Sequence, residues 1–149
     1  MKTEHNFELG FDKFQLKVPQ DLYYAGYDTW VRVEGENAVI GMTDFIQTKV
    51  GDIFFFNPVE AQALEQDEVL GTIESIKATV DITIPVSGDQ LEFNPALKSS
   101  PELISHDPYG QGWIAKLHLT DWEMDNSMLL PANKYFELMQ EKVKNALDD

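Results

Sequence analysis

The stretch Gly71-Thr72-Ile73-Glu74-Ser75-Ile76-Lys77-Ala78-Thr79-Val80-Asp81, followed by Pro85-Val86-Ser87-Gly88, determines how the rest of the chain is interpreted. From Val80 to Ser87, apolar residues alternate with more polar ones, a two-residue period typical of a strand with one face in a core. The residues from Val69 to Ile76 are also rich in strand formers. The pattern predicts a β-hairpin with Lys77 at or near its turn, although the turn lacks the Asn-Gly or Asp-Gly pair of the strongest hairpin signals.

A lysine at a hairpin turn has two interpretations. For most such lysines the side chain is only a solvated charge on the surface. An exposed ε-amine on a rigid arm is also an attachment point for an acyl group. The residues around Lys77 and elsewhere in the chain must decide between these interpretations.

Four blocks of sequence favour acyl attachment. They are Glu74–Ala78 with Asp81 and Pro85–Gly88, Gly41–Phe45 with Gly51–Ile53, Pro101–Ile104, and Asp107–Trp113. In their order and spacing, from about Asp21 to Leu130, the chain resembles the glycine cleavage system H-protein family. Biotin carriers share the hairpin-lysine design but resemble Met-Lys-Met at the modified site, whereas this chain has Ile76-Lys77-Ala78.

The resemblance implies a mostly β fold, a barrel-sandwich hybrid of two antiparallel sheets with short helices and a C-terminal helix. It implies that Lys77 carries covalently attached lipoic acid as lipoyl-lysine, and that the chain shuttles an aminomethyl group without catalytic residues of its own. The implied partners are a pyridoxal-phosphate glycine decarboxylase, an aminomethyltransferase, dihydrolipoamide dehydrogenase and a lipoate-attaching enzyme. Glu74 and Asp81 would help that last enzyme to recognise the hairpin; their alternative role is to keep the strand edges soluble.

Two other functions stay open on the sequence alone. The family commonly has a His-Glu-Trp segment where this chain has Tyr27-Asp28-Thr29-Trp30. H-like lipoate-binding proteins also serve bacterial sulfur oxidation with a heterodisulfide-reductase-like complex, and this chain could be such a carrier. The third interpretation keeps the fold without the arm, as an unmodified interaction module.

Composition excludes several classes of function. The 149 residues are enough for one domain with a real core. A formal net charge of −15, with Arg32 as the only arginine, disfavours binding to nucleic acid or to anionic membranes. The absence of cysteine excludes disulfides and thiolate sites, so any redox sulfur must come from an attached group. The histidines have no metal-binding spacing, and we predict no metal site. No signal-like or membrane-length apolar run occurs, which predicts a cytoplasmic protein.

The sequence also predicts how the chain is divided. We expect an N-terminal extension over residues 1–20 that packs on the domain, a carrier domain over 21–131, and an amphipathic C-terminal helix over 132–149. Within the domain, Trp30–Val33 and Ala38–Met42 are expected to form a hairpin. Thr43 is expected to cap a short helix, and Ile53–Phe56 to form a buried strand.

Overall fold

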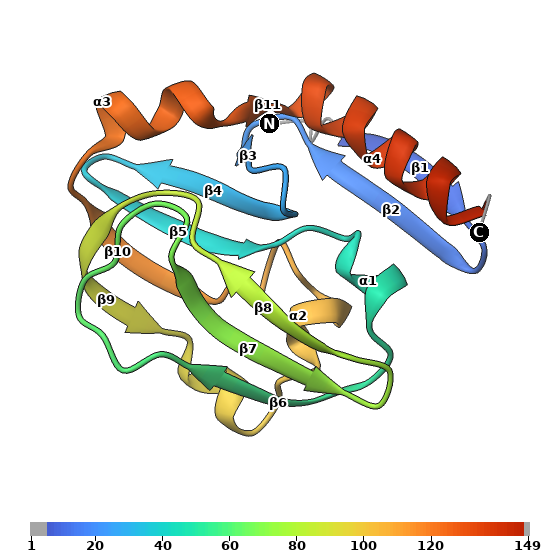
Figure 1. Ribbon diagram of the computed structural model, residues 1–149, viewed down its shortest axis with the longest axis horizontal. Helices are drawn as coiled ribbons and strands as arrows, with labels where there is room; N and C mark the ends of the chain where they lie inside the picture. Colours follow the sequence, from blue (N-terminus) through green and yellow to red (C-terminus); the bar gives the residue numbers. More distant parts are fainter. Residues whose placement is uncertain (1–5, 148–149) are drawn as a thin grey trace, which may run out of the picture.

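Two antiparallel sheets face each other in the computed structural model, which describes residues 6–147 (Figure 1). The larger sheet has the strand order β11-β3-β4-β5-β10-β9 and the smaller one the order β6-β7-β8. The strands of the larger sheet are β3 (Tyr23–Tyr24), β4 (Thr29–Glu34), β5 (Asn37–Met42), β9 (Gly88–Phe93), β10 (Ala115–Leu119) and β11 (Leu130–Pro131). Those of the smaller sheet are β6 (Ile53–Pro58), β7 (Val69–Ser75) and β8 (Thr79–Thr83). The sandwich of two antiparallel sheets predicted from the sequence is confirmed.

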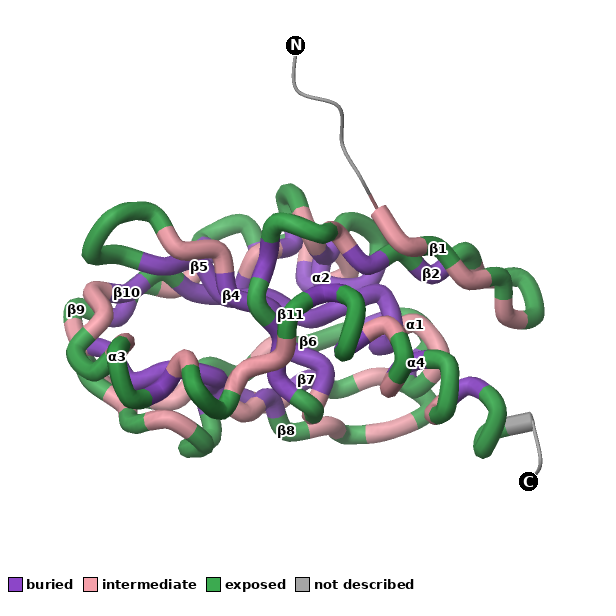
Figure 2. Tube along the Cα trace, turned by 90° about the horizontal axis from the view of Figure 1, so that it is seen from above, coloured by how far each residue is buried: buried purple, intermediate pink, exposed green. Residues whose placement is uncertain are grey.

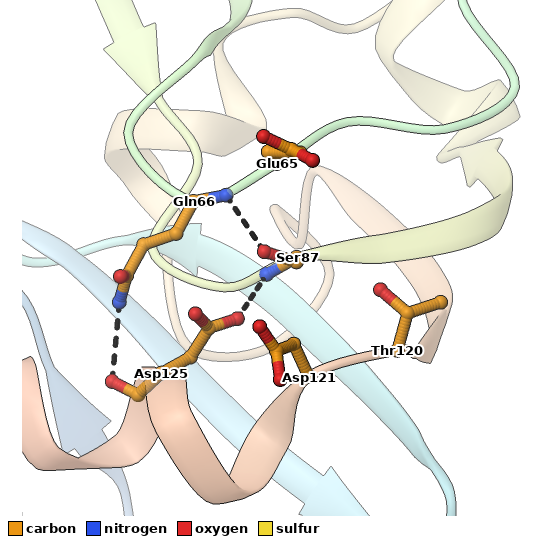
Figure 3. A pocket seen from close by; sticks show the side chains of 6 residues that line it. All are labelled: Glu65, Gln66, Ser87, Thr120, Asp121 and Asp125. Atoms are coloured by element: carbon orange, nitrogen blue, oxygen red, sulfur yellow. Dashed lines mark hydrogen bonds between the residues drawn. The ribbon is translucent and has the colours of Figure 1, made fainter.

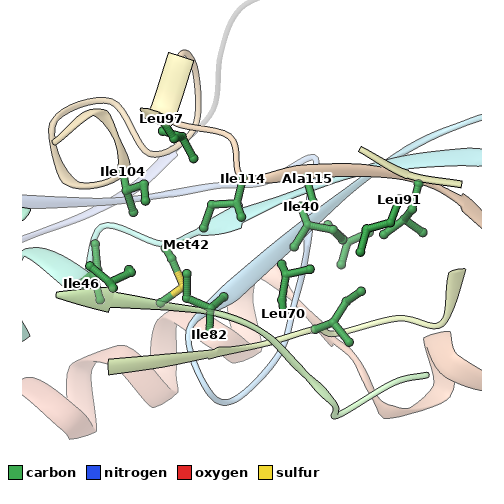
Figure 4. Packing of buried hydrophobic residues seen from close by; sticks show 14 of the residues in the cluster. Ile40, Met42, Ile46, Leu70, Ile82, Leu91, Leu97, Ile104, Ile114 and Ala115 are labelled. Atoms are coloured by element: carbon green, nitrogen blue, oxygen red, sulfur yellow. The ribbon is translucent and has the colours of Figure 1, made fainter. Parts of the chain in front are cut away.

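The core between the two sheets is built from aliphatic side chains (Figure 4). Ile40 of β5 lies on one side of it, and Leu70 of β7 and Ile82 of β8 lie on the other, all three with no solvent exposure. Burial of each such side chain contributes about 1.5–3 kcal/mol. This core therefore fixes the smaller sheet, and the hairpin that belongs to it, against the rest of the molecule.

The larger sheet is covered on its other face by the C-terminal helix α4 (Ala132–Leu147), so that β4 and β5 are buried on both faces. Tyr135, Met139 and Val143 recur at four-residue intervals along α4 and belong to the same apolar cluster as Trp30 and Val39 of the sheet. This is the amphipathic pattern that the sequence indicated. The C-terminal helix is confirmed and begins at Ala132.

Strands β1 (Asn6–Phe11) and β2 (Phe14–Pro19) pair with each other and form a separate two-stranded sheet (Figures 1 and 2). They do not extend either sheet of the sandwich. Their apolar residues pack against α4, where Phe7 stacks on Phe136 with ring centroids 5.1 Å apart. The division of the chain into 1–20, 21–131 and 132–149 stays a prediction.

Side chains of the sandwich form hydrogen bonds with the backbone of Lys17 in β2. The backbone N–H of Lys17 donates to Asp44 Oδ2 at 2.8 Å, and the Tyr109 hydroxyl donates to the backbone oxygen of Lys17 at 2.5 Å. Asp44 also accepts a hydrogen bond from Gln47 Nε2 at 2.9 Å. Burial raises the pKa of the Asp44 carboxyl above its usual range, although the hydrogen bonds from Lys17 and Gln47 act to lower it.

The remaining helical segments are short. They are α1 (Ile46–Lys49), η1 (Pro95–Lys98), α2 (Leu103–His106), α3 (Trp122–Asp125) and η2 (Asn126–Met128). The predicted cap at Thr43 is wrong. Phe45 occupies the N-cap position of α1 without a side-chain hydrogen bond, and the Thr43 hydroxyl instead lies 2.6 Å from the Tyr135 hydroxyl of α4. The Thr43 hydroxyl thus bonds to a buried residue distant in the sequence and not to the first turn of α1.

The prediction of a buried strand at Ile53–Phe56 is also wrong in one respect. The strand forms, as β6, but the exposed fraction of Phe54 is 50% and that of Phe55 is 63%. The pairing of β6 with β7 shifts between Ile53, which faces Ser75, and Phe55, which faces Glu74. This bulge places two residues of β6 opposite one residue of β7, so the inward–outward alternation is interrupted and both phenylalanines face solvent.

Candidate functional site

A short turn joins β7 to β8 at one end of the molecule, the end at which α1 also lies (Figure 1). The backbone N–H of Ser75 donates to the backbone oxygen of Ala78 at 3.0 Å. The Ser75 hydroxyl donates to that same oxygen at 3.0 Å and accepts from the backbone N–H of Ala78 at 3.1 Å. Ile76 and Lys77 form the apex between these residues. The predicted hairpin with Lys77 at its turn is confirmed.

The side chain of Lys77 is exposed at this apex. Within residues 6–147, its Nζ atom makes no hydrogen bond and no ion pair. An acyl group could therefore be attached without breaking an existing interaction. The geometry fits an attachment point for a cofactor.

The hairpin below the turn is anchored firmly. Ile73 of β7 and Ile82 of β8 have no solvent exposure and belong to the core between the sheets, whereas the exposed fraction of Ile76 reaches 80%. Burial thus changes from complete at Ile73 of β7 to almost absent at Ile76 of the turn, three residues later. The turn is held by a rigid base and projects from it.

Glu74 and Asp81 lie on the outward face of the hairpin. Glu74 pairs with Thr79, and Asp81 pairs with Thr72, so the two carboxylates lie on neighbouring strands two rows apart, with the Ile73–Val80 pair between them. Each accepts one hydrogen bond from a neighbouring side chain: Glu74 Oε2 from Asn57 Nδ2 at 3.0 Å, and Asp81 Oδ1 from the Thr72 hydroxyl at 3.1 Å. Both are exposed. The structure therefore brings the three residues singled out from the sequence to one end of the smaller sheet.

Sequence reasoning missed the two exposed aromatic residues beside this turn. Phe54 and Phe55 lie on β6, the strand that pairs with β7, at the level of Glu74 and Ser75. In the sequence they belong to a run of three phenylalanines, which gives the same apolar pattern whether the side chains face the core or solvent. Only the bulge in the pairing distinguishes the two arrangements.

A polar cavity of about 390 Å³ lies away from the hairpin turn, between the loop before β7 and helix α3 (Figure 3). Hydrogen bonds connect three of its lining residues. Ser87 donates its backbone N–H to Asp125 Oδ2 at 2.6 Å, and Gln66 donates to the Ser87 hydroxyl and to the backbone oxygen of Asp125. These bonds fasten the loop to α3. The cavity is lined by none of the candidate site residues Lys77, Glu74 and Asp81.

A buried carboxylate connects α4 to the sandwich. Asp28 is only 1% exposed, and its Oδ1 accepts from the Tyr135 hydroxyl at 2.7 Å and from Lys142 Nζ at 2.8 Å. Lys49 Nζ of α1 lies 3.4 Å from its Oδ2. Burial and the charge of Asp28 raise the pKa of Tyr135 well above its usual range, so Tyr135 stays a donor to Asp28 and accepts from Thr43. This network fixes α4 and α1 in place.

Nothing in the described part of the chain forms a metal site, because no cluster of three or more His, Asp or Glu side chains has suitable geometry there. His118 Nδ1 lies 3.1 Å from Asp89 Oδ1, His106 ends α2, and His5 lies outside the described residues. Across residues 6–147, no helix is long and apolar enough to cross a membrane.

Comparison with known proteins identifies the family. The family model described as "Glycine cleavage H-protein" matches residues 22–142. This chain belongs to the glycine cleavage H-protein family. The match begins after the β1–β2 hairpin and extends into α4.

Individual H proteins agree with the family match. The glycine cleavage system H protein of Bacteroides fragilis is 43% identical over 122 residues, which cover 80% of this chain and 95% of that protein. The corresponding protein of Symbiobacterium thermophilum is 46% identical over 120 residues, covering 79% and 92%. The crystal structure of a glycine cleavage system H protein from Mycobacterium marinum superposes with a TM-score of 0.69 at 29% identity, covering 79% of this chain and 95% of that one.

Proposed function

We propose that Lys77 carries a lipoyl group in amide linkage, and that the chain is a carrier that moves an aminomethyl group between the enzymes of glycine cleavage. The observation that carries this proposal is the position of Lys77, exposed and without an ion-pair partner among residues 6–147, at the apex of a hairpin whose base is buried. Membership of the H-protein family supports it. The names of the matching relatives favour glycine cleavage over a carrier of sulfur oxidation or an unmodified module.

The attachment step has simple chemical requirements. The deprotonated ε-amine of Lys77 attacks the carbonyl carbon of an activated lipoyl ester or anhydride. The C–N bond forms, the bond to the activating group breaks, and the amine proton passes to a base or to solvent. The attached group supplies a redox-active disulfide to a chain that has no cysteine. The protein's own part is to present the amine on a fixed support.

The remaining roles follow from the same proposal. The decarboxylase, the aminomethyltransferase and dihydrolipoamide dehydrogenase would act on the arm in the cytoplasm, and the chain would contribute no catalytic residue. Glu74 and Asp81 would be contacted by the lipoate-attaching enzyme, because both are exposed on the hairpin that carries Lys77. A tethered arm raises the local concentration of each intermediate at the next enzyme.

The intact mass of the protein from its native host tests the proposal. The mass is expected to exceed that of the bare chain by one lipoyl group, and the excess should disappear in Lys77→Arg. Lys98→Arg is the matched control, since Lys98 is also an exposed lysine at a turn-like position. A native protein without added mass would refute lipoylation. A lipoylated protein that accepts no aminomethyl group from glycine with the decarboxylase would refute the glycine-cleavage role.

A further inference from the structure

Three exposed apolar residues belong to the end of the smaller sheet that carries the Lys77 turn. Ile76 is 80% exposed, next to Lys77, while Phe54 and Phe55 are 50% and 63% exposed on the adjacent strand. We call these three residues the apolar bulge surface. Phe54 and Phe55 are the only phenylalanines with this degree of exposure in the part of the chain that the structure describes. Large apolar side chains grouped on a surface mark interaction sites more often than isolated ones do.

The backbone explains why these side chains face solvent. The β-bulge between Ile53 and Phe55 directs two consecutive aromatic residues outward, where an uninterrupted strand would have turned one of them toward the core. β6 is an edge strand of its sheet, so no further strand lies beside it on the side away from β7. Phe54 is 50% and Phe55 63% exposed, and this solvent-exposed aromatic surface has no evident structural benefit.

We propose that the apolar bulge surface is a contact site for the lipoate-attaching enzyme. This inference rests on the proposed lipoylation of Lys77. The enzyme must bring an activated carbonyl to within about 3–3.5 Å of Lys77 Nζ. Its active site must therefore enclose the turn, and Phe54 and Phe55 lie only one strand spacing, about 5 Å, from the end of β7.

The attaching enzyme is a better candidate for this contact than the enzymes that act later. Before lipoylation there is no arm, so the protein surface alone must supply recognition. The later enzymes act at the end of a lipoyl-lysine arm, which places them farther from β6. They can contact the arm and need not contact the bulge.

The surroundings define the chemistry of the partner surface. The exposed carboxylates Asp52 and Glu74 lie beside Phe54 and Phe55, Asp81 lies farther away on β8, and the whole chain carries a formal charge of −15. The complementary surface is an apolar hollow bordered by lysine or arginine side chains. Interfaces of this type place aromatic anchors at the centre and charged groups at the rim, where the charges mainly accelerate encounter.

The test measures lipoylation of the full chain by a purified lipoate-attaching enzyme supplied with free lipoate and ATP. Initial rates, followed by intact mass, are compared for the parent, Phe54→Ser/Phe55→Ser, and the conservative Phe54→Leu/Phe55→Leu. The serine variant is expected to raise KM for the carrier about tenfold, as for the loss of an anchoring aromatic contact, with kcat unchanged. The leucine variant should recover most of the loss. The melting temperature of the leucine variant should stay close to that of the parent, whereas that of the serine variant should fall somewhat, because Phe54 and Phe55 are only 50% and 63% exposed; rates are therefore compared below both melting temperatures.

The matched control is Met124→Ser/Met128→Ser. These residues are 71% and 72% exposed and lie on α3 and η2, far from the hairpin turn (Figure 1). Equal KM values for the parent and the phenylalanine variant would overturn the inference, provided that the parent is modified at Lys77. A parent chain that takes no lipoyl group would refute the proposed function and this inference with it.

A second measurement tests the choice of enzyme. The phenylalanine variant is lipoylated to completion with excess enzyme, and reduction of its arm by dihydrolipoamide dehydrogenase and its loading by the decarboxylase are then measured. Both rates are expected to equal those of the parent. Slower loading combined with normal lipoylation would overturn the assignment to the attaching enzyme.

Discussion

Ser75→Ala tests whether a single hydroxyl group keeps the turn around Lys77 closed. In the parent this hydroxyl donates to the backbone oxygen of Ala78 and accepts from its N–H, at 3.0 and 3.1 Å. One hydrogen bond contributes about 0.5–1.5 kcal/mol net, and water replaces part of it at an exposed turn. We therefore expect a local loss of about 1 kcal/mol, which opens the turn about fivefold more often. The backbone bond from Ser75 to Ala78 remains and limits the loss.

Amide hydrogen exchange measured by NMR is the direct assay. In the variant the N–H of Ala78 loses its acceptor, the Ser75 hydroxyl, and should exchange much faster. The amides of Ile73 and Ile82, whose side chains are buried in the core, should keep their protection. Ser75→Thr retains the hydroxyl and is the matched control. If the attaching enzyme requires the closed turn, its kcat/KM for the carrier falls in proportion to the closed fraction, and it changes little as long as the closed turn predominates.

Two results would refute this reasoning. If Ala78 exchanges at the same rate in Ser75→Ala and in the parent, the hydroxyl does not hold the turn. If the amides of Ala78, Ile73 and Ile82 exchange at one common rate, the turn opens only together with the core below it and is not a separate unit. In either case Lys77 would be positioned by something other than Ser75.

Three further substitutions test the scaffold. Tyr135→Phe leaves the buried carboxylate of Asp28 without one of its donors and should cost about 1–3 kcal/mol in chemical denaturation; an unchanged midpoint would mean that the network adds no stability. Gly112→Ala places a Cβ against the backbone oxygen of Leu103, so we expect a thermal midpoint lower by several degrees, and a neutral result would contradict that close approach. Asp44→Asn tests the raised pKa of Asp44. Because the folded chain holds this proton more tightly than the unfolded one, the resulting stability is complete below the ordinary aspartate pKa and is lost as pH rises through the raised value. The variant should therefore gain stability relative to the parent in denaturant titrations as pH rises from the ordinary aspartate pKa of about 3.9 to the raised value, whereas parallel curves would argue against the shift.

The features that the sequence predicted correctly depend on local patterns. The alternation after Lys77 identifies β8, because neighbouring residues of a strand face opposite sides whatever lies beyond them. The four-residue spacing of Tyr135, Met139 and Val143 identifies α4 for the same reason. These patterns were enough to place the candidate attachment lysine at a hairpin turn.

The features that it did not predict depend on partners distant in the chain. Thr43 has the residue type of a helix cap, but its hydroxyl is taken by Tyr135, 92 residues away. Phe54 and Phe55 have the residue type of a buried strand, but the register of β6 against β7 turns them outward. No local pattern carries that information, and the exposed aromatic contacts beside Lys77 were therefore missed.

The order of the strands has a consequence for how the chain folds. β7 and β8 are joined by one turn, so the Lys77 hairpin has low contact order, whereas the larger sheet must pair Ile40 of β5 with Ala115 of β10 and close a long loop. Pairings of that kind are formed slowly because loop-closure entropy is lost before any contact compensates for it. We expect the hairpin to form early and to become packed against a complete core only when β10 pairs with β5. Acyl attachment that requires the supported hairpin would then also select chains that have finished folding.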